Sequence, residues 1–203
     1  MSPLSIALLG AMLAPLFIAT WRTSLIGLAC QGWLMAWMAW RVGPPHDAEG
    51  WITLVDLALV RGVAAPLALG WTLQERRAPA RSDVIPPNLL SWTFALGLVL
   101  LAFQLSERLA EEPGARADVA VAAAGLLLGF LVLSTKTSAF SQTMGALRVE
   151  NSIALLELGA PHHGSPWLAV GRVSALVWTI ALLRAHLGRE GRDAEPPATE
   201  AAL

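Results

Sequence analysis

Six ionisable side chains stand inside long apolar stretches of the sequence, where a charge is difficult to place. A charged group at the centre of a bilayer costs about 2.5–3.5 kcal/mol on insertion scales, so each of these residues needs a partner or a function. The six residues are Asp56, Arg61, Arg148, Glu150, Glu157 and Arg172. Carboxyl groups at this depth can bind and release protons, and ion pairs can instead lock helices together.

The stretch 140–159 is the most polar of these and holds Glu150 at its midpoint. On an α-helix Glu157 falls within about 20° of the same face and about 10 Å along the axis. Asn151 adds a hydrogen-bonding group, and Gly145 permits close helix approach. Desolvation disfavours the charged form of a carboxyl, as a proton relay requires, unless a nearby arginine counteracts it. The pattern therefore predicts a proton-relay site; the alternative is a neutral or ion-paired glutamate that joins helices.

A second pair of charges lies in the stretch 51–73. Asp56 and Arg61 are five residues apart, about 140° around an α-helix, so each is expected to find its partners on other helices. Pro66 leaves the carbonyl of Gly62 without its usual donor, and such breaks pack against protein or water rather than lipid. Arg61 is therefore predicted to face the bundle, either as a functional charge or as one that fixes helix packing.

The elements that must position these residues are membrane helices. Of 203 residues 55% are apolar and only 14% charged, against about 25% charged in an ordinary soluble domain. Mean hydropathy is +0.57. Seven apolar runs are long enough to suggest spans: 3–20, 24–41, 51–73, 88–106, 117–135, 140–159 and 166–187. The sequence predicts an all-α polytopic bundle in a single transmembrane domain, 1–187, followed by a polar, disordered tail, 188–203.

The basic residues predict the orientation of this bundle, because short cytoplasmic loops are rich in Lys and Arg. Eight fall on one side: Arg22, Arg76, Arg77, Arg81, Lys136, Arg184, Arg189 and Arg192. Three fall on the other: Arg41, Arg108 and Arg116. The bias predicts an outside N-terminus and an inside C-terminus.

Several function classes are disfavoured. A net charge of −1 without a basic block makes nucleic acid a poor partner, and no cofactor, phosphate-binding or catalytic motif is present. The chain is therefore expected to hold no cofactor, metal or active site of its own. Cys30 is expected to be a small buried hydrophobe. His162 and His163 could bind a metal, but a solvated turn is the better interpretation.

The run 142–153, QTMGALRVENSI, resembles a signature of the hydrogenase-4 component E family. The run 59–66, LVRGVAAP, is similar to that family's third-helix motif, with Arg61 at a lysine position. The resemblance covers essentially the whole chain, and 117–187 resembles the three-helix K subunit of respiratory complex I and the C subunit of Mrp-type antiporters.

This resemblance implies a non-catalytic subunit of a bacterial inner-membrane assembly that moves protons or other cations. Its partners would be antiporter-like and quinone-site-type membrane subunits and a peripheral hydrogenase or related module. Glu150 would be the buried glutamate of the family. The last helix departs from the pattern, because Ala169 and Ala175 stand at the expected carboxylate positions and Arg172 is added.

Two other hypotheses compete with the ion-conducting subunit. In the first, the chain is a structural scaffold whose charges only lock it to antiporter-like partners; the missing carboxylates favour this alternative. In the second, it is an independent small transporter, for which inverted repeats and discontinuous helices would be expected. Neither feature is evident in the sequence.

Overall fold

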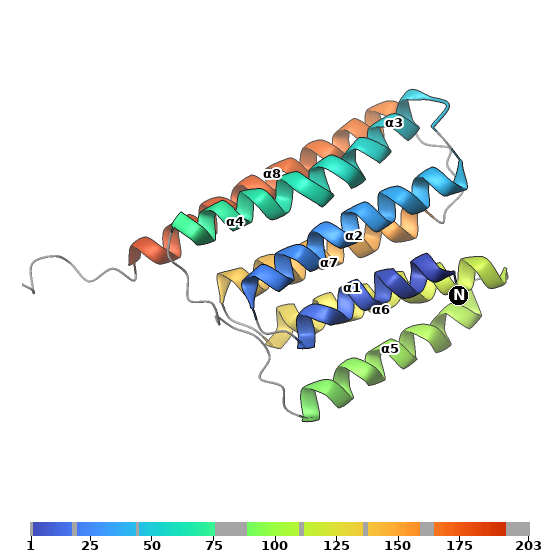
Figure 1. Ribbon diagram of the computed structural model, residues 1–203, viewed down its shortest axis with the longest axis horizontal. Coiled ribbons are helices and arrows are strands. Elements are labelled where there is room, and N and C mark those ends of the chain that lie inside the picture. The colour runs from blue at the N-terminus through green and yellow to red at the C-terminus, as the bar shows by residue number, and fades with distance from the viewer. Residues whose placement is uncertain are drawn as a thin grey trace, which may run out of the picture.

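The computed structural model describes residues 2–17, 20–43, 45–75, 89–109, 112–135, 138–158 and 165–193, and the secondary structure of these ranges is helical. They form seven continuous helices, of which the third is built from three successive elements (Figure 1). The elements are α1 (Pro3–Phe17), α2 (Trp21–Val42), α3 (Ala48–Val55), η1 (Asp56–Ala64), α4 (Ala65–Glu75), α5 (Leu89–Leu109), α6 (Pro113–Thr135), α7 (Ala139–Leu158) and α8 (Pro166–Asp193). The all-α prediction is confirmed.

Each helix overlaps one of the seven apolar runs, and local capping explains some of the boundaries. The Thr20 hydroxyl accepts a hydrogen bond from the Thr23 backbone N–H at 3.3 Å, and the Asp47 carboxylate accepts one from the Gly50 backbone N–H at 2.8 Å. These caps start α2 and α3. Helix α8 continues to Asp193, into the segment expected to be a tail; the rest of that tail lies outside the described residues.

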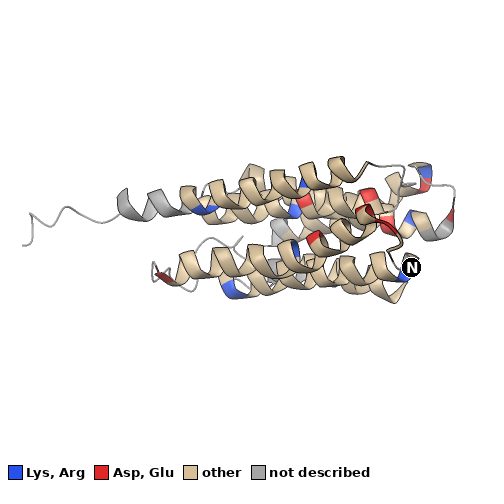
Figure 2. Ribbon diagram, turned by 90° about the horizontal axis from the view of Figure 1, so that it is seen from above, with Lys and Arg blue, Asp and Glu red and all other residues tan. Residues whose placement is uncertain are grey.

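Four of the described helices are long and apolar enough to cross a membrane: Ala48–Glu75, Trp92–Leu109, Ala115–Thr135 and Pro166–His186. Large apolar side chains cover the outside of the bundle, with Trp178 70% and Leu182 66% exposed. Most residues of the helices are uncharged, as Figure 2 shows. Such an exterior is compatible with a multi-pass protein surrounded by lipid.

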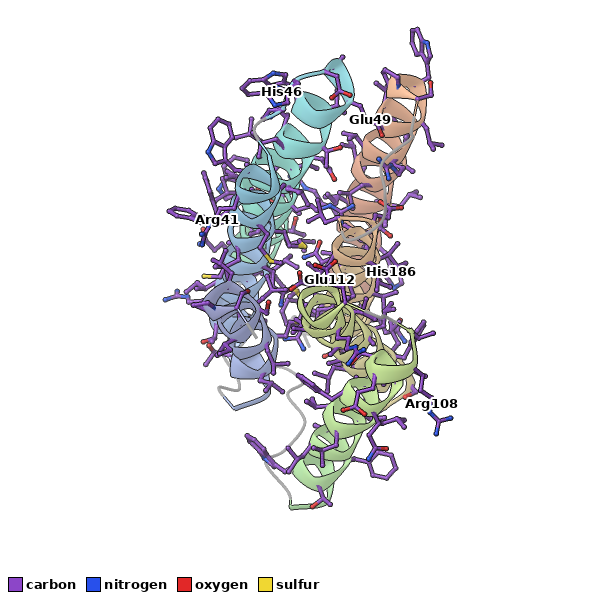
Figure 3. The ribbon with its side chains drawn as sticks, turned by 90° about the vertical axis from the view of Figure 1, so that its right-hand side faces the viewer. Arg41, His46, Glu49, Arg108, Glu112 and His186 are labelled. Atoms are coloured by element: carbon purple, nitrogen blue, oxygen red, sulfur yellow. The ribbon has the colours of Figure 1, made fainter. Side chains whose placement is uncertain are left out.

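The helices run roughly along one common axis (Figure 1). Helix α7 lies between α6 and α2, α5 packs on α6, and α8 lies beside the continuous helix from α3 to α4. The N-terminus and the last turn of α8 lie at opposite ends of the bundle. We call the end that holds the N-terminus the N-terminal end. Figure 3 views the bundle from that end and labels Arg41, His46, Glu49, Arg108 and Glu112, which belong to or adjoin the ends of α2, α3, α5 and α6 that lie there in Figure 1.

Glycines set the closest contacts between helices. A Cβ atom built on Gly129 would lie 2.7 Å from Val149 Cγ2, and one built on Gly145 would lie 3.2 Å from the Gly129 backbone oxygen. Helices α6 and α7 therefore touch along their backbones. The close approach expected at Gly145 is confirmed.

The expectation for Cys30 is wrong, because its side chain is exposed. It lies on the face of α2 that also turns Trp33, Trp37 and Trp40 away from the bundle. An apolar run suits a lipid-facing surface as well as a protein core, and composition alone does not separate the two.

Candidate functional site

The segment with Asp56 and Arg61 is a π-helix, which changes the relation between these two residues. Hydrogen bonds in a π-helix run from i to i+5, so residues five apart lie above one another. Arg61 Nε donates to Asp56 Oδ2 at 2.8 Å, and both side chains are buried. The expectation that the pair diverges and finds partners only on other helices is therefore wrong for Asp56, because it assumed α-helical geometry.

Helices η1 and α2 cross in close contact at Gly32 and Gly62. A Cβ atom built on Gly32 would lie 2.5 Å from the Gly62 backbone nitrogen and 2.6 Å from its Cα. Position 32 therefore has no room for a side chain where the backbones meet, whereas a Cβ atom on Gly62 would meet Trp33 at 3.1 Å. The crossing brings the residues before the two glycines, Gln31 and Arg61, into the same buried region.

Pro66 and Gly62 are both buried, so the interrupted part of this helix packs against protein, as the sequence predicts. The π-helix lies immediately before Ala65 and Pro66. Its hydrogen-bond pattern continues to that point, where the Ala65 backbone N–H donates to the Val60 carbonyl. The helix passes through the proline without ending.

Arg61 uses its planar guanidinium to bind three side chains. In addition to Asp56, Nη1 donates to Asn151 Oδ1 at 3.0 Å and Nη2 donates to Glu150 Oε1 at 3.4 Å. Only 5% of the Arg61 side chain is exposed. Arginine suits this position because its donors form a fixed fork, which a lysine ammonium does not. The predicted bundle-facing position of Arg61 is confirmed.

Asn151 continues the hydrogen-bond chain into α2. Its Nδ2 group donates to Gln31 Oε1 at 3.3 Å, and both amides are buried. The chain therefore runs from Asp56 through Arg61 and Asn151 to Gln31. Asp56 Oδ1 and Gln31 Nε2, at its two ends, are buried and have no hydrogen-bond partner among the described residues. A water molecule could donate to the carboxylate oxygen and another could accept from the amide.

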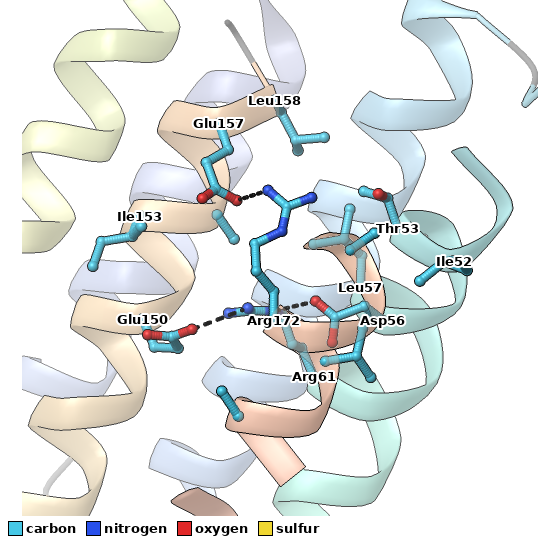
Figure 4. Close-up of a pocket in the computed structure, with 14 residues that line it drawn as sticks. Ile52, Thr53, Asp56, Leu57, Arg61, Glu150, Ile153, Glu157, Leu158 and Arg172 are labelled. Carbon is cyan, nitrogen blue, oxygen red and sulfur yellow. Dashed lines mark hydrogen bonds and ion pairs between the residues drawn. The ribbon is translucent and has the colours of Figure 1, made fainter. Parts of the chain in front are cut away.

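A second ion pair joins α7 to α8. Arg172 Nη1 donates to Glu157 Oε2 at 2.6 Å, and the side chains are 35% and 44% exposed. Glu157 was predicted to share a face with Glu150, and Figure 4 shows both residues on the same side of α7. Arg172, the added residue of the last helix, thus satisfies one of the two glutamates.

The two ion-pair groups line one cavity of about 160 Å³ between α3, η1, α7 and α8 (Figure 4). Its charged lining consists of Asp56, Arg61, Glu150, Glu157 and Arg172. This volume is ample for several water molecules, and the polar lining would hold them. Ala169 and Ala175 also line the cavity. The two alanines therefore lie beside the predicted relay group.

Arg148 lies apart from this cavity. It is buried on the opposite face of α7 from Glu150 and forms no ion pair with any described residue. It is not the cation that compensates Glu150.

A further contact lies between α1 and α6, where the Ser5 hydroxyl donates to Asp118 Oδ1 at 2.7 Å.

Sequence reasoning missed Gln31. A sequence signal for it existed, because Gln31 is the only side-chain amide in its apolar run, but a search for charged groups alone passes over it.

In the described ranges no group of three or more metal-ligating side chains is close enough to hold an ion. His162 and His163 lie outside those ranges.

The site therefore consists of two ion-pair groups around a polar cavity within an apolar bundle. No protein-family model, curated protein or solved structure matches this chain.

Proposed function

We propose that this chain is a multi-pass membrane subunit in which Glu150 exchanges a proton within the cavity. The observation that carries the proposal is an imbalance of charge. Three carboxylates, those of Asp56, Glu150 and Glu157, share the cavity with two guanidinium groups, those of Arg61 and Arg172. One carboxylate lacks a full positive partner, so a proton or another monovalent cation would neutralise the group.

Glu150 is the carboxylate best placed to be that group. Asp56 holds Arg61 at 2.8 Å and Glu157 holds Arg172 at 2.6 Å, whereas Glu150 is 3.4 Å from Arg61. Its side chain is 40% exposed, so it reaches the cavity and can change its protonation state without breaking a short ion pair. Arg61 would stabilise the ionised state and Glu150 would pass the proton on.

We further propose that all seven helices cross a bacterial inner membrane. The N-terminus would lie outside and the C-terminus inside, as the basic residues predict. The chain belongs beside antiporter-like and quinone-site-type subunits and beneath a peripheral hydrogenase or related module, as the likeness of 142–153 to the hydrogenase-4 component E family suggests. Redox chemistry would reside in that module.

Substitution of Glu150 by Gln tests the proposal, because glutamine keeps the shape and hydrogen bonding but cannot titrate. In vesicles that contain the intact assembly, E150Q is expected to reduce coupled proton movement at least ten-fold. E107Q is the matched control, because Glu107 is exposed on α5 and lies outside the cavity. Unchanged coupled proton movement in E150Q would exclude the relay.

A scaffold function is the second candidate. It is favoured by the last helix, where the cavity is lined by Ala169 and Ala175 and Arg172 is committed to Glu157. A scaffold would retain proton movement in E150Q but lose its partners in R61Q, because Arg61 fixes η1 to α7. Co-purification in mild detergent, measured beside proton movement, separates the two functions.

A further inference from the structure

The cavity around Glu150 extends towards only one end of the bundle. Its lining comes from α3 and the first turns of η1, from the last turns of α7 and from the first turns of α8. These segments all lie on the side of the N-terminal end (Figure 1). Thr53, Glu157 and Arg172 stand between that end and Glu150 (Figure 4). A polar path therefore leads from the N-terminal end to the middle of the bundle.

On the other side of Arg61 the bundle is closed by apolar side chains. A buried cluster from α2, α4, α7 and α8 fills the space beyond η1. Its members are Trp21, Leu25, Leu28, Ala65, Leu69, Leu73, Ala139, Phe140, Met144, Leu147, Leu176 and Ile180. We call this group the apolar seal. None of these side chains offers water a strong hydrogen-bond acceptor. The buried hydroxyls of Ser24, Thr72, Ser141 and Thr143 lie on neighbouring turns, but none of them lines the cavity. The cavity therefore ends at this cluster.

The Arg172–Glu157 pair lies within the polar path. Both side chains are only partly buried, and both line the cavity. At a separation of 2.6 Å the pair places a positive charge beside the path and satisfies Glu157. Glu150, 3.4 Å from Arg61, is the carboxylate on the path without a short ion pair. Asp56 Oδ1, buried without a partner among the described residues and part of the lining, provides an acceptor for water at the same depth.

We infer that water and protons reach Glu150 from the N-terminal end only, and that the apolar seal prevents their passage to the opposite end along the axis of this chain. What the path is used for rests on the proposed function, but the path itself is a property of the bundle. It makes this chain a one-sided access route to Glu150 and not a complete channel.

Cysteine accessibility tests the inference. Cys30 is the only cysteine of the chain, so C30S gives a background without thiols. T53C and A175C place thiols in the cavity, and L69C and L176C place them in the apolar seal. A charged, membrane-impermeant methanethiosulfonate is applied to either side of vesicles that contain the intact assembly. E112C and R184C, exposed near opposite ends, report the orientation of the vesicles.

We expect T53C and A175C to react from the side of E112C only, at least ten-fold faster than L69C and L176C react from either side. Labelling after denaturation shows that all thiols are intact, and an unchanged elution profile shows that the variants are folded. Reaction of L69C or L176C from the side of R184C would overturn the seal. Failure of A175C to react from either side would overturn the water path.

The inference and the proposed function fail separately. If E150Q abolishes proton movement while both ends give access to the cavity thiols, the relay stands and one-sided access is wrong. If access is one-sided but E150Q moves protons normally, the cavity is real and the relay is wrong.

Discussion

Arg61 and Asp56 are five residues apart and form a 2.8 Å ion pair within a single helix. The pair exists because Asp56–Ala64 is a π-helix, in which the side chains at i and i+5 face the same way. π-Helical segments are frequent at functional sites. Here Nε of Arg61 donates to a carboxylate of its own helix, while Nη1 and Nη2 of the same guanidinium donate to residues of α7.

Removal of Arg61 should strongly destabilise the bundle. Breaking a buried ion pair by removing one partner costs about 3–5 kcal/mol, because the other charge is left without compensation. R61Q would leave Asp56 in that state. The measurement is unfolding in detergent followed by the fluorescence of the tryptophans.

The double variant D56N/R61Q is the control for this prediction. Its loss of stability should be smaller than the sum of the two single losses, because no uncompensated charge remains at Asp56, while Glu150 loses its Arg61 contact in R61Q and in the double variant alike. R61K should lie between wild type and R61Q, since one ammonium cannot reproduce the three-way fork. Additive losses would show that the pair does not couple the two residues.

The crossing of α2 and η1 predicts a sharp difference between two glycines. In G32A the new methyl group would meet the backbone of Gly62 at 2.5 Å, so the helices must separate. Overpacking of this kind costs about 1–3 kcal/mol. G97A is the matched control, because a Cβ atom on Gly97 meets nothing within 4 Å, and alanine in place of an exposed helical glycine gains about 1 kcal/mol. Equal unfolding midpoints for G32A and wild type would contradict this packing.

The length and apolar composition of the runs were sufficient to predict the helices. Each run bounded by Gly, Pro or polar clusters became a helix, because a segment without polar partners must satisfy its backbone internally. The position of Arg61 inside the bundle was also predictable, since a guanidinium is too costly to leave in lipid. The same reasoning placed Glu150 and Glu157 on one face, where the structure has both of them in the cavity lining.

Helix type and partner choice were not predictable in this way. The π-helix carries the backbone contact between Gly32 and Gly62, which lie on different elements far apart in the sequence. The outward position of Cys30 depends on which face of α2 its neighbours cover. Periodicity identifies what a helix can bury, but the neighbours decide what it does bury.

The second ion pair should contribute little to stability. Glu157 and Arg172 are 44% and 35% exposed, and partly hydrated pairs of this kind are worth about 0–1 kcal/mol. E157Q and R172Q should therefore unfold within a few degrees of wild type, far from R61Q. In proton movement E157Q should retain more activity than E150Q, because Glu157 already holds a cation at 2.6 Å. A loss in E157Q as large as that in E150Q would place the relay at both glutamates.

The two alanines of α8 should respond differently to a carboxylate. Ala169 and Ala175 both line the cavity, but Ala169 is 2% exposed and Ala175 is exposed. A169D would force a charge into a packed position and should destabilise the bundle by about 1–3 kcal/mol or more, since the buried group gains no partner. A175D has room to contact water and should fold normally. It adds a second titratable carboxyl beside Glu150, so coupled proton movement should increase in A175D and not in the isosteric control A175N. If A175D and A175N behave alike, a carboxylate on the last helix makes no difference to this chain, and Glu150 with Arg61 is sufficient.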